Sequence, residues 1–123
     1  KYINEEEILA RFEAGPVKSK LDFNMAAINV DGVLFFFSQG EPFCEYQMEA
    51  RESFPGKTVF FAGYTGGQNS YLPSAHAFAT RKGYEYEIEQ MHVYIKAPYP
   101  LSDKMPDKYI ESICEVTEEA LAQ

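Results

Sequence analysis

The sequence predicts an α/β fold with a mixed sheet, in which a hairpin and a βαβ crossover are flanked by helices. Two apolar runs, VLFFF at residues 33–37 and TVFFA at residues 58–62, have the length and composition of strands. Asp31-Gly32 separates the first run from a strand-like segment at residues 21–30, which is a strong hairpin signal. A helix-like segment lies between the two apolar runs, so the order strand, helix, strand indicates a parallel crossover.

The length of 123 residues suits one domain, and 46% hydrophobic with 24% charged residues is a globular composition. A formal net charge of −8 would repel a phosphate backbone, so nucleic acid is not an expected partner. The longest apolar run is far shorter than the roughly 20 residues that cross a bilayer, so we expect no transmembrane segment. Because the sequence begins at Lys1, we expect a chain processed or cut from a longer one.

The first half of the chain supplies the sheet. Asn4 and Glu7 form a capping-box pattern, which predicts a helix over residues 4–13 before the first strand. Five consecutive apolar residues at 33–37 predict a strand covered on both faces. After a turn at residues 38–40, we expect Glu41 at or before the first turn of a helix and Pro42 as an early helix residue.

The second half begins with a glycine-containing loop and is mainly helical. We expect a short helix at residues 73–80, a loop and strand at 84–95, and an amphipathic helix at 106–121. In a parallel crossover, Gly40-Glu41 and Gly63-Tyr64 both lie at the carboxyl edge of neighbouring strands. The two loops are therefore expected to face one crevice.

Glu41 is a candidate metal ligand because it is an acid at the end of a strand, held between Gly40 and Pro42. The alternative is a glutamate that complements the dipole of a helix N-terminus. Tyr71 is a weaker candidate, because phenolate is an uncommon zinc ligand, and its alternative is packing. Neither interpretation is excluded by the residues alone.

Two histidines offer a different metal site, made of Glu41 with His76 and His92. No ligand-pair spacing such as HExxH connects the two histidines, so the pattern is weak. The glycine loop lacks the GK[ST] ending of a phosphate loop, and no serine stands in a GxSxG context. The sequence therefore gives little support to nucleotide binding or to a motif-defined nucleophile.

The order of several short motifs carries more information than any one residue. An apolar strand is followed by SQGEPF, a helix, the strand TVFFAGYT, and then NSYLP, HAFAT and GYEYE. Over residues 25–97 this order resembles the C-terminal part of the catalytic domain of neutral/alkaline non-lysosomal ceramidases. The resemblance implies a hydrolase of lipid and sphingolipid metabolism, a zinc-dependent amidase that cleaves ceramide, or a similar N-acyl amide, to sphingosine and a fatty acid.

By that resemblance, Glu41 matches an acidic zinc ligand and Tyr71 matches a tyrosine ligand. Tyr84 matches a phenol that stabilises the oxyanion formed when zinc-bound water attacks the amide carbonyl. The family's two histidine ligands and its serine have no counterpart in this sequence. We therefore expect a fragment that is inactive alone and binds zinc poorly by itself, although the parent enzyme would hold Zn²⁺ and a lipid-like amide substrate.

The same resemblance implies a secreted, periplasmic or membrane-associated location. A free-standing, non-catalytic binding or oligomerisation domain is the alternative to an enzyme fragment. A fragment should expose an apolar patch larger than is normal for a monomer, or bury it by forming a homo-oligomer. A complete module should not expose such a patch.

Overall fold

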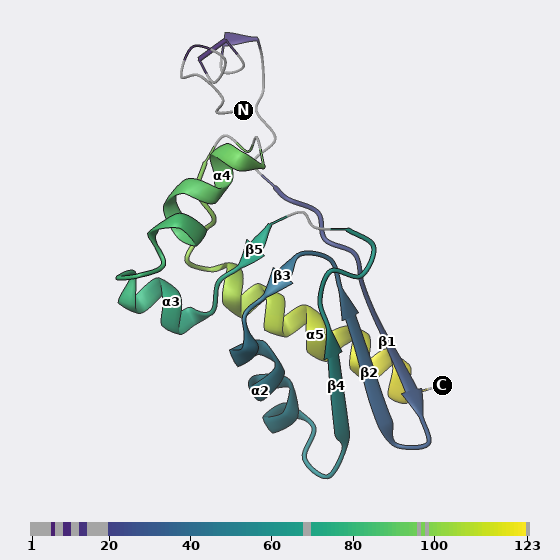
Figure 1. Ribbon diagram of the computed structural model, residues 1–123. Coiled ribbons are helices and arrows are strands. Elements are labelled where there is room, and N and C mark those ends of the chain that lie inside the picture. The colour runs from purple at the N-terminus through teal and green to yellow at the C-terminus, as the bar shows by residue number, and fades with distance from the viewer. Residues whose placement is uncertain are drawn as a thin grey trace.

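Figure 1 shows a computed structural model of the chain, which describes residues 6, 9, 10, 13, 14, 20–67, 70–95, 97 and 99–122. It has a three-stranded mixed sheet, a two-stranded parallel sheet and several helices, so the predicted α/β class is confirmed. The helix expected at residues 4–13 falls largely outside the described residues. Within the described part of the chain, every helix is too short or too polar to span a bilayer.

The three-stranded sheet has the order β1-β2-β4. β1 (Met25–Val30) pairs antiparallel with β2 (Val33–Ser38), and β2 pairs in parallel with β4 (Thr58–Ala62). Asp31 and Gly32 connect the hairpin with φ values of 49° and 83°, the left-handed backbone that a tight hairpin turn requires. Both the predicted hairpin and the predicted crossover are therefore present.

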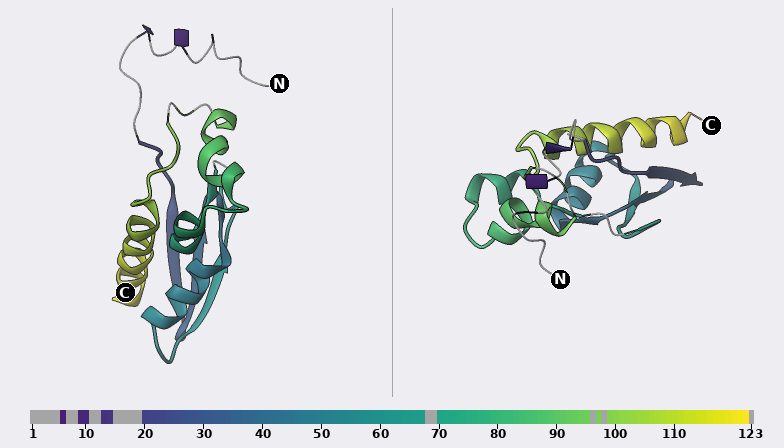
Figure 2. Two further views of the ribbon diagram at one scale, coloured as in Figure 1. Left: turned by 90° about the vertical axis from the view of Figure 1, so that its left-hand side faces the viewer. Right: turned by 90° about the horizontal axis from the view of Figure 1, so that it is seen from above.

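The main core lies on one face of this sheet, where α2 (Cys44–Ser53) packs against β4 and α5 (Met105–Leu121) packs against β1 and β2. Figure 2, seen from above, shows α5 running along that face. Leu34 and Phe36 of β2 meet Tyr46 of α2 and Ile113 of α5 there. The α5 helix that the sequence predicts is present with nearly the expected bounds.

The opposite face of the sheet differs from the prediction. β2 alternates between half-buried and buried residues, so it is not covered on both faces as its apolar run suggested. The reason is that both helices pack on one side. The other side, here called the open sheet face, consists of Ala26, Ile28, Val30, Val33, Phe35, Phe37, Thr58, Phe60 and Ala62. Phe35 and Phe60 stack on it with ring centroids 5.3 Å apart.

The second sheet pairs β3 (Glu41–Pro42) with β5 (Tyr71–Leu72) in parallel. The expectation that Pro42 is an early helix residue is therefore wrong, because α2 begins at Cys44. The physical reason is that the backbone of residues 40–43 bonds to residues 67–72 instead of to a following helical turn. This two-residue strand carries Glu41 to the edge where β2 and β4 end (Figure 1).

Three short helices follow β5: α3 (Ala75–Thr80), the π-helix η1 (Tyr86–Gln90) and α4 (Met91–Tyr94). The short helix at residues 73–80 is confirmed, but the strand expected within residues 84–95 is wrong. Tyr84, Tyr86 and Ile88 alternate with glutamates and so imitate a strand, yet Ile88 and Met91 are buried at helical spacing. Packing of Ile88 against Ala77 and Phe78 therefore overrides the alternation.

Candidate functional site

The candidate site is built on the pairing of β3 with β5, in which Glu41 and Tyr71 occupy the same register position. The Glu41 N–H donates to the Ser70 carbonyl oxygen at 2.8 Å, and the Gly40 N–H donates to the Gly67 carbonyl oxygen at 3.0 Å. Register partners in a parallel pair project their side chains to the same side. The fold thus brings together the two residues that the sequence analysis singled out as metal ligands.

Two glycines, Gly40 and Gly63, lie where backbone segments approach closely next to this pair. Gly40 has a φ of 77°, and a Cβ atom there would lie 2.9 Å from the Ser70 carbonyl oxygen. A Cβ atom at Gly63 would lie 2.8 Å from Cδ of Pro42. Gly40 therefore permits the close approach of the Ser70 backbone, and Gly63 permits the close approach of Pro42.

Tyr64 joins the pair from the loop after β4. Its N–H donates to the Gly40 carbonyl oxygen at 2.8 Å, and its φ of 59° is unusual for a residue with a side chain. A side-chain hydrogen bond to Glu41 raises the pKa of the Tyr64 phenol to about 12. The phenol is therefore protonated at neutral pH and able to donate to the carboxylate.

The pKa of Tyr71 is raised as well, first by the negative charge of Glu41 and then by burial and a hydrogen bond to the same carboxylate. Glu87 adds to this effect through its charge. The local potential at Tyr71 is thus negative, which opposes ionisation of the phenol. A bound cation would have the opposite effect, because its charge favours the phenolate.

Tyr86 forms the far side of the site. Its ring meets that of Tyr71 edge to face, with centroids 6.2 Å apart and an interplanar angle of 77°. It lies in η1, and short π-helical segments often occur at functional sites. The sequence predicts Gly63-Tyr64 at this edge but gives no sign of a role for Tyr64 or Tyr86, because contacts between side chains of separate loops leave no spacing pattern in the sequence.

Tyr84, the expected oxyanion donor, lies beside this group. Its ring packs on Phe43 with centroids 5.6 Å apart and belongs to the smaller core cluster with Phe78 and Ile88. Phe43 follows Glu41 by two residues in extended backbone, so the two side chains project to the same side. Tyr84 therefore borders the site through Phe43.

The two histidines do not join Glu41. His76 lies exposed on α3, with its Nε2 atom 3.5 Å from the Thr80 hydroxyl, whereas His92 lies in α4 instead of the expected strand. Among the described residues, no group of three His, Cys, Asp or Glu side chains could hold a metal ion. The alternative site of Glu41 with both histidines is therefore not assembled in the described structure.

The side chains that do meet offer one carboxylate and one phenol as oxygen donors, with a second phenol bonded to the carboxylate. This set fits part of a cation site, in which the Tyr64 hydrogen bond would orient Glu41 as outer partners orient metal ligands. It falls short of the three protein ligands of a catalytic zinc site. No protein-family model, curated protein or solved structure matches this chain.

Proposed function

We propose that this chain is part of a zinc-dependent amidohydrolase resembling neutral ceramidase, in which Glu41 and Tyr71 supply two of the metal ligands. The observation that carries the proposal is their shared register position between β3 and β5, thirty residues apart in the sequence. The resemblance selected the same two residues on sequence order alone. The strand pairing and the family resemblance therefore support the same two residues.

In this proposal each phenol has a separate task. Tyr64 holds the Glu41 carboxylate through its hydrogen bond, and Tyr71 faces the same carboxylate. Tyr84, next to Phe43, donates a hydrogen bond to the oxygen of the amide carbonyl as negative charge develops there, a contact worth roughly 3 kcal/mol in other enzymes. The zinc ion, when bound, polarises the carbonyl and makes water a nucleophile at neutral pH.

The remaining ligands would come from sequence outside these 123 residues. We therefore expect weak zinc binding by this chain and amide hydrolysis only by a longer protein that contains it. Ceramide and other N-acyl amides are the substrates to test, because half a site does not select among them.

The experiment measures zinc binding to the wild type, Glu41→Gln and Tyr71→Phe by calorimetry, and follows tyrosinate absorbance during the titration. Tyr94→Phe is the control, because Tyr94 is 72% exposed on α4, outside the site. We expect binding and the tyrosinate signal to be lost in Tyr71→Phe, and binding to weaken in Glu41→Gln. Unchanged binding in both variants would contradict the proposal.

A second candidate function, a non-catalytic binding or oligomerisation domain, would use the open sheet face as its contact surface. Ile28, Val30 and Phe60 are each more than half exposed there, and none of the nine side chains of this face is charged. In a fragment this face would pack against the rest of the parent domain, whereas in a module it would contact a second copy. Sedimentation of the isolated chain, with and without Phe60→Lys, distinguishes a self-associating chain from a monomer.

A further inference from the structure

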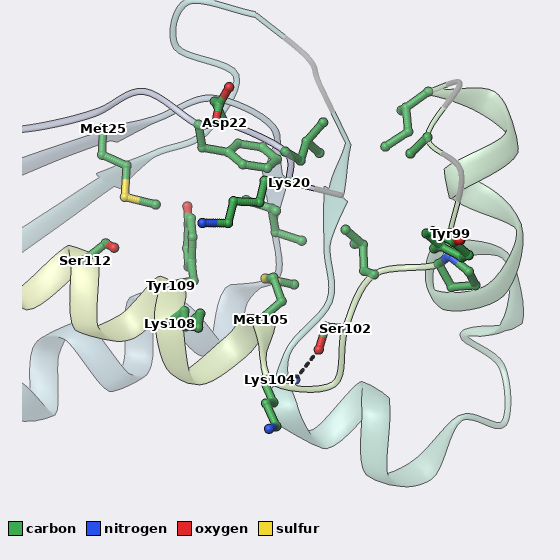
Figure 3. A pocket seen from close by; sticks show the side chains of 17 residues that line it. Lys20, Asp22, Met25, Tyr99, Ser102, Lys104, Met105, Lys108, Tyr109 and Ser112 are labelled. Atoms are coloured by element: carbon green, nitrogen blue, oxygen red, sulfur yellow. Dashed lines mark hydrogen bonds between the residues drawn. The ribbon is translucent and has the colours of Figure 1, made fainter. Parts of the chain in front are cut away.

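A groove of about 950 Å³ lies on the other side of the molecule's second sheet from the candidate site, between the segment before β1 and the start of α5 (Figure 3). Its volume is within the range typical of small-molecule sites. Its walls are mainly apolar and include Leu21, Phe23, Leu72, Ile95, Leu101 and Met105.

This groove is separate from the Glu41–Tyr71 site. Leu72 lines the groove, and Tyr71 precedes it on the same strand. Because successive side chains of a strand project to opposite sides, Tyr71 faces away from the groove. A ligand in the groove would therefore not touch Glu41, and its binding is independent of the proposed hydrolase function.

The groove gathers positive charge in an acidic chain. Lys20, Lys104 and Lys108 line it, three of the chain's eleven basic residues, and among the described residues that line it only Asp22 is acidic. They come from different places: Lys20 precedes β1, Lys104 precedes α5, and Lys108 lies on the first turn of α5. Figure 3 shows Lys20 extending into the groove toward Tyr109, while Lys104 points outward at its edge.

We propose that this groove binds a single-chain amphiphile with one carboxylate head, such as a free fatty acid anion. The apolar walls would bury the alkyl chain, and Lys20 with Lys108 would neutralise the head group. A purely apolar ligand would form no ion pair with the lysines, and a small polar anion would leave the apolar walls exposed to water. The combination of a long apolar wall with ammonium groups fits a ligand that has both features.

The test is calorimetric titration of the chain with monomeric dodecanoate, decanoate and octanoate, and with dodecanol as the uncharged analogue. Each methylene that enters the groove should strengthen binding up to about fourfold. The Lys20→Gln/Lys108→Gln double variant should weaken dodecanoate binding on the order of tenfold and leave dodecanol binding unchanged. Lys57→Gln removes one positive charge just before β4, outside the groove, and should have no effect.

A second variant, Ser112→Phe, places a large side chain in the groove from α5 and should reduce the binding of both dodecanoate and dodecanol. Circular dichroism and a thermal melt show whether each variant is folded. The same chain is also mixed with anionic phospholipid vesicles and sedimented. Dodecanoate binding that is indifferent to both lysines and to Ser112→Phe, or binding to vesicles only, would overturn the proposal.

Discussion

Glu41 and Tyr71 lie opposite each other in a parallel strand pair of only two residues per strand, and the charge of the carboxylate raises the pKa of the phenol. A short pair of this kind contributes few backbone hydrogen bonds of its own. Neighbouring backbone bonds hold it in place: the Phe43 N–H donates to the Leu72 carbonyl oxygen at 3.1 Å, and the Tyr64 N–H donates to the Gly40 carbonyl oxygen at 2.8 Å. The position of the candidate site is thus determined by loop contacts.

The first prediction concerns the phenols. Glu41→Gln removes the negative charge and the acceptor that raise both pKa values, so the pKa of Tyr64 should fall from about 12 toward 10, and that of Tyr71 should also fall. Tyrosine-selective NMR titration measures both. Glu115→Gln on α5 is the matched control and should leave both values in place. A Tyr64 pKa that does not move would show that Glu41 is not its partner.

The second prediction concerns the close approach of the Ser70 backbone to Gly40. Gly40→Ala must tolerate both a φ of 77° and a contact of 2.9 Å with a carbonyl oxygen. Gly56→Ala is the matched control, because its φ is 80° but a Cβ atom would meet nothing within 4 Å. We expect Gly56→Ala to cost about 1 kcal/mol of unfolding free energy and Gly40→Ala clearly more. Urea unfolding measures both, and equal losses would argue against the close approach.

The third prediction concerns the Tyr109 hydroxyl, which donates to Ser38 Oγ at 2.7 Å inside the core. Ser38→Ala leaves this phenol buried without its acceptor and should cost roughly 1–3 kcal/mol. Tyr109→Phe should cost less, and the double variant less than the sum of the two single variants. A double-mutant cycle by urea unfolding checks this, and strict additivity would contradict it.

The fourth prediction concerns stability at high pH. Burial raises the pKa of Tyr109 to about 12 from 10.0 and raises that of Tyr46 as well. The folded state therefore holds these protons more tightly than the unfolded state. The stabilisation is complete below pH 10 and is lost as the pH rises through 12, by roughly 3 kcal/mol for Tyr109. Thermal melts between pH 9 and pH 12 should show this loss, and Tyr109→Phe should show less of it.

The fifth prediction concerns the open sheet face. Phe60 is 53% exposed and stacks on Phe35, so a lysine at this position should disrupt any contact made through the face. We expect the wild type to self-associate with rising concentration and Phe60→Lys to remain monomeric in analytical ultracentrifugation. Lys82→Gln, which changes charge in the loop after α3, is the control. A monomeric wild type would contradict this use of the face.

The elements with strong local signals could be predicted from the sequence. The hairpin at Asp31-Gly32, the short α3 helix and the long amphipathic α5 helix each depend on signals within one segment, and the parallel crossover follows from the order strand, helix, strand. The sequence could not show that only one face of β2 is covered by helices, because an apolar run is compatible with packing on one face or on both. Alternation at Tyr84, Tyr86 and Ile88 was likewise ambiguous, and packing of Ile88 decided in favour of helix.

For the candidate site, the sequence by itself determined that the turns Gly40-Glu41 and Gly63-Tyr64 share one edge of the sheet, because strand order fixes which loops share an edge. Tyr71 was paired with Glu41 only by the family resemblance. Only the tertiary structure decided that the two residues are register partners and that Tyr64 and Tyr86 adjoin them. The physical reason is that these contacts depend on backbone bonds between residues 38–43 and 64–72, which glycine permits at Gly40 and Gly63. Such long-range bonds have no period in the sequence.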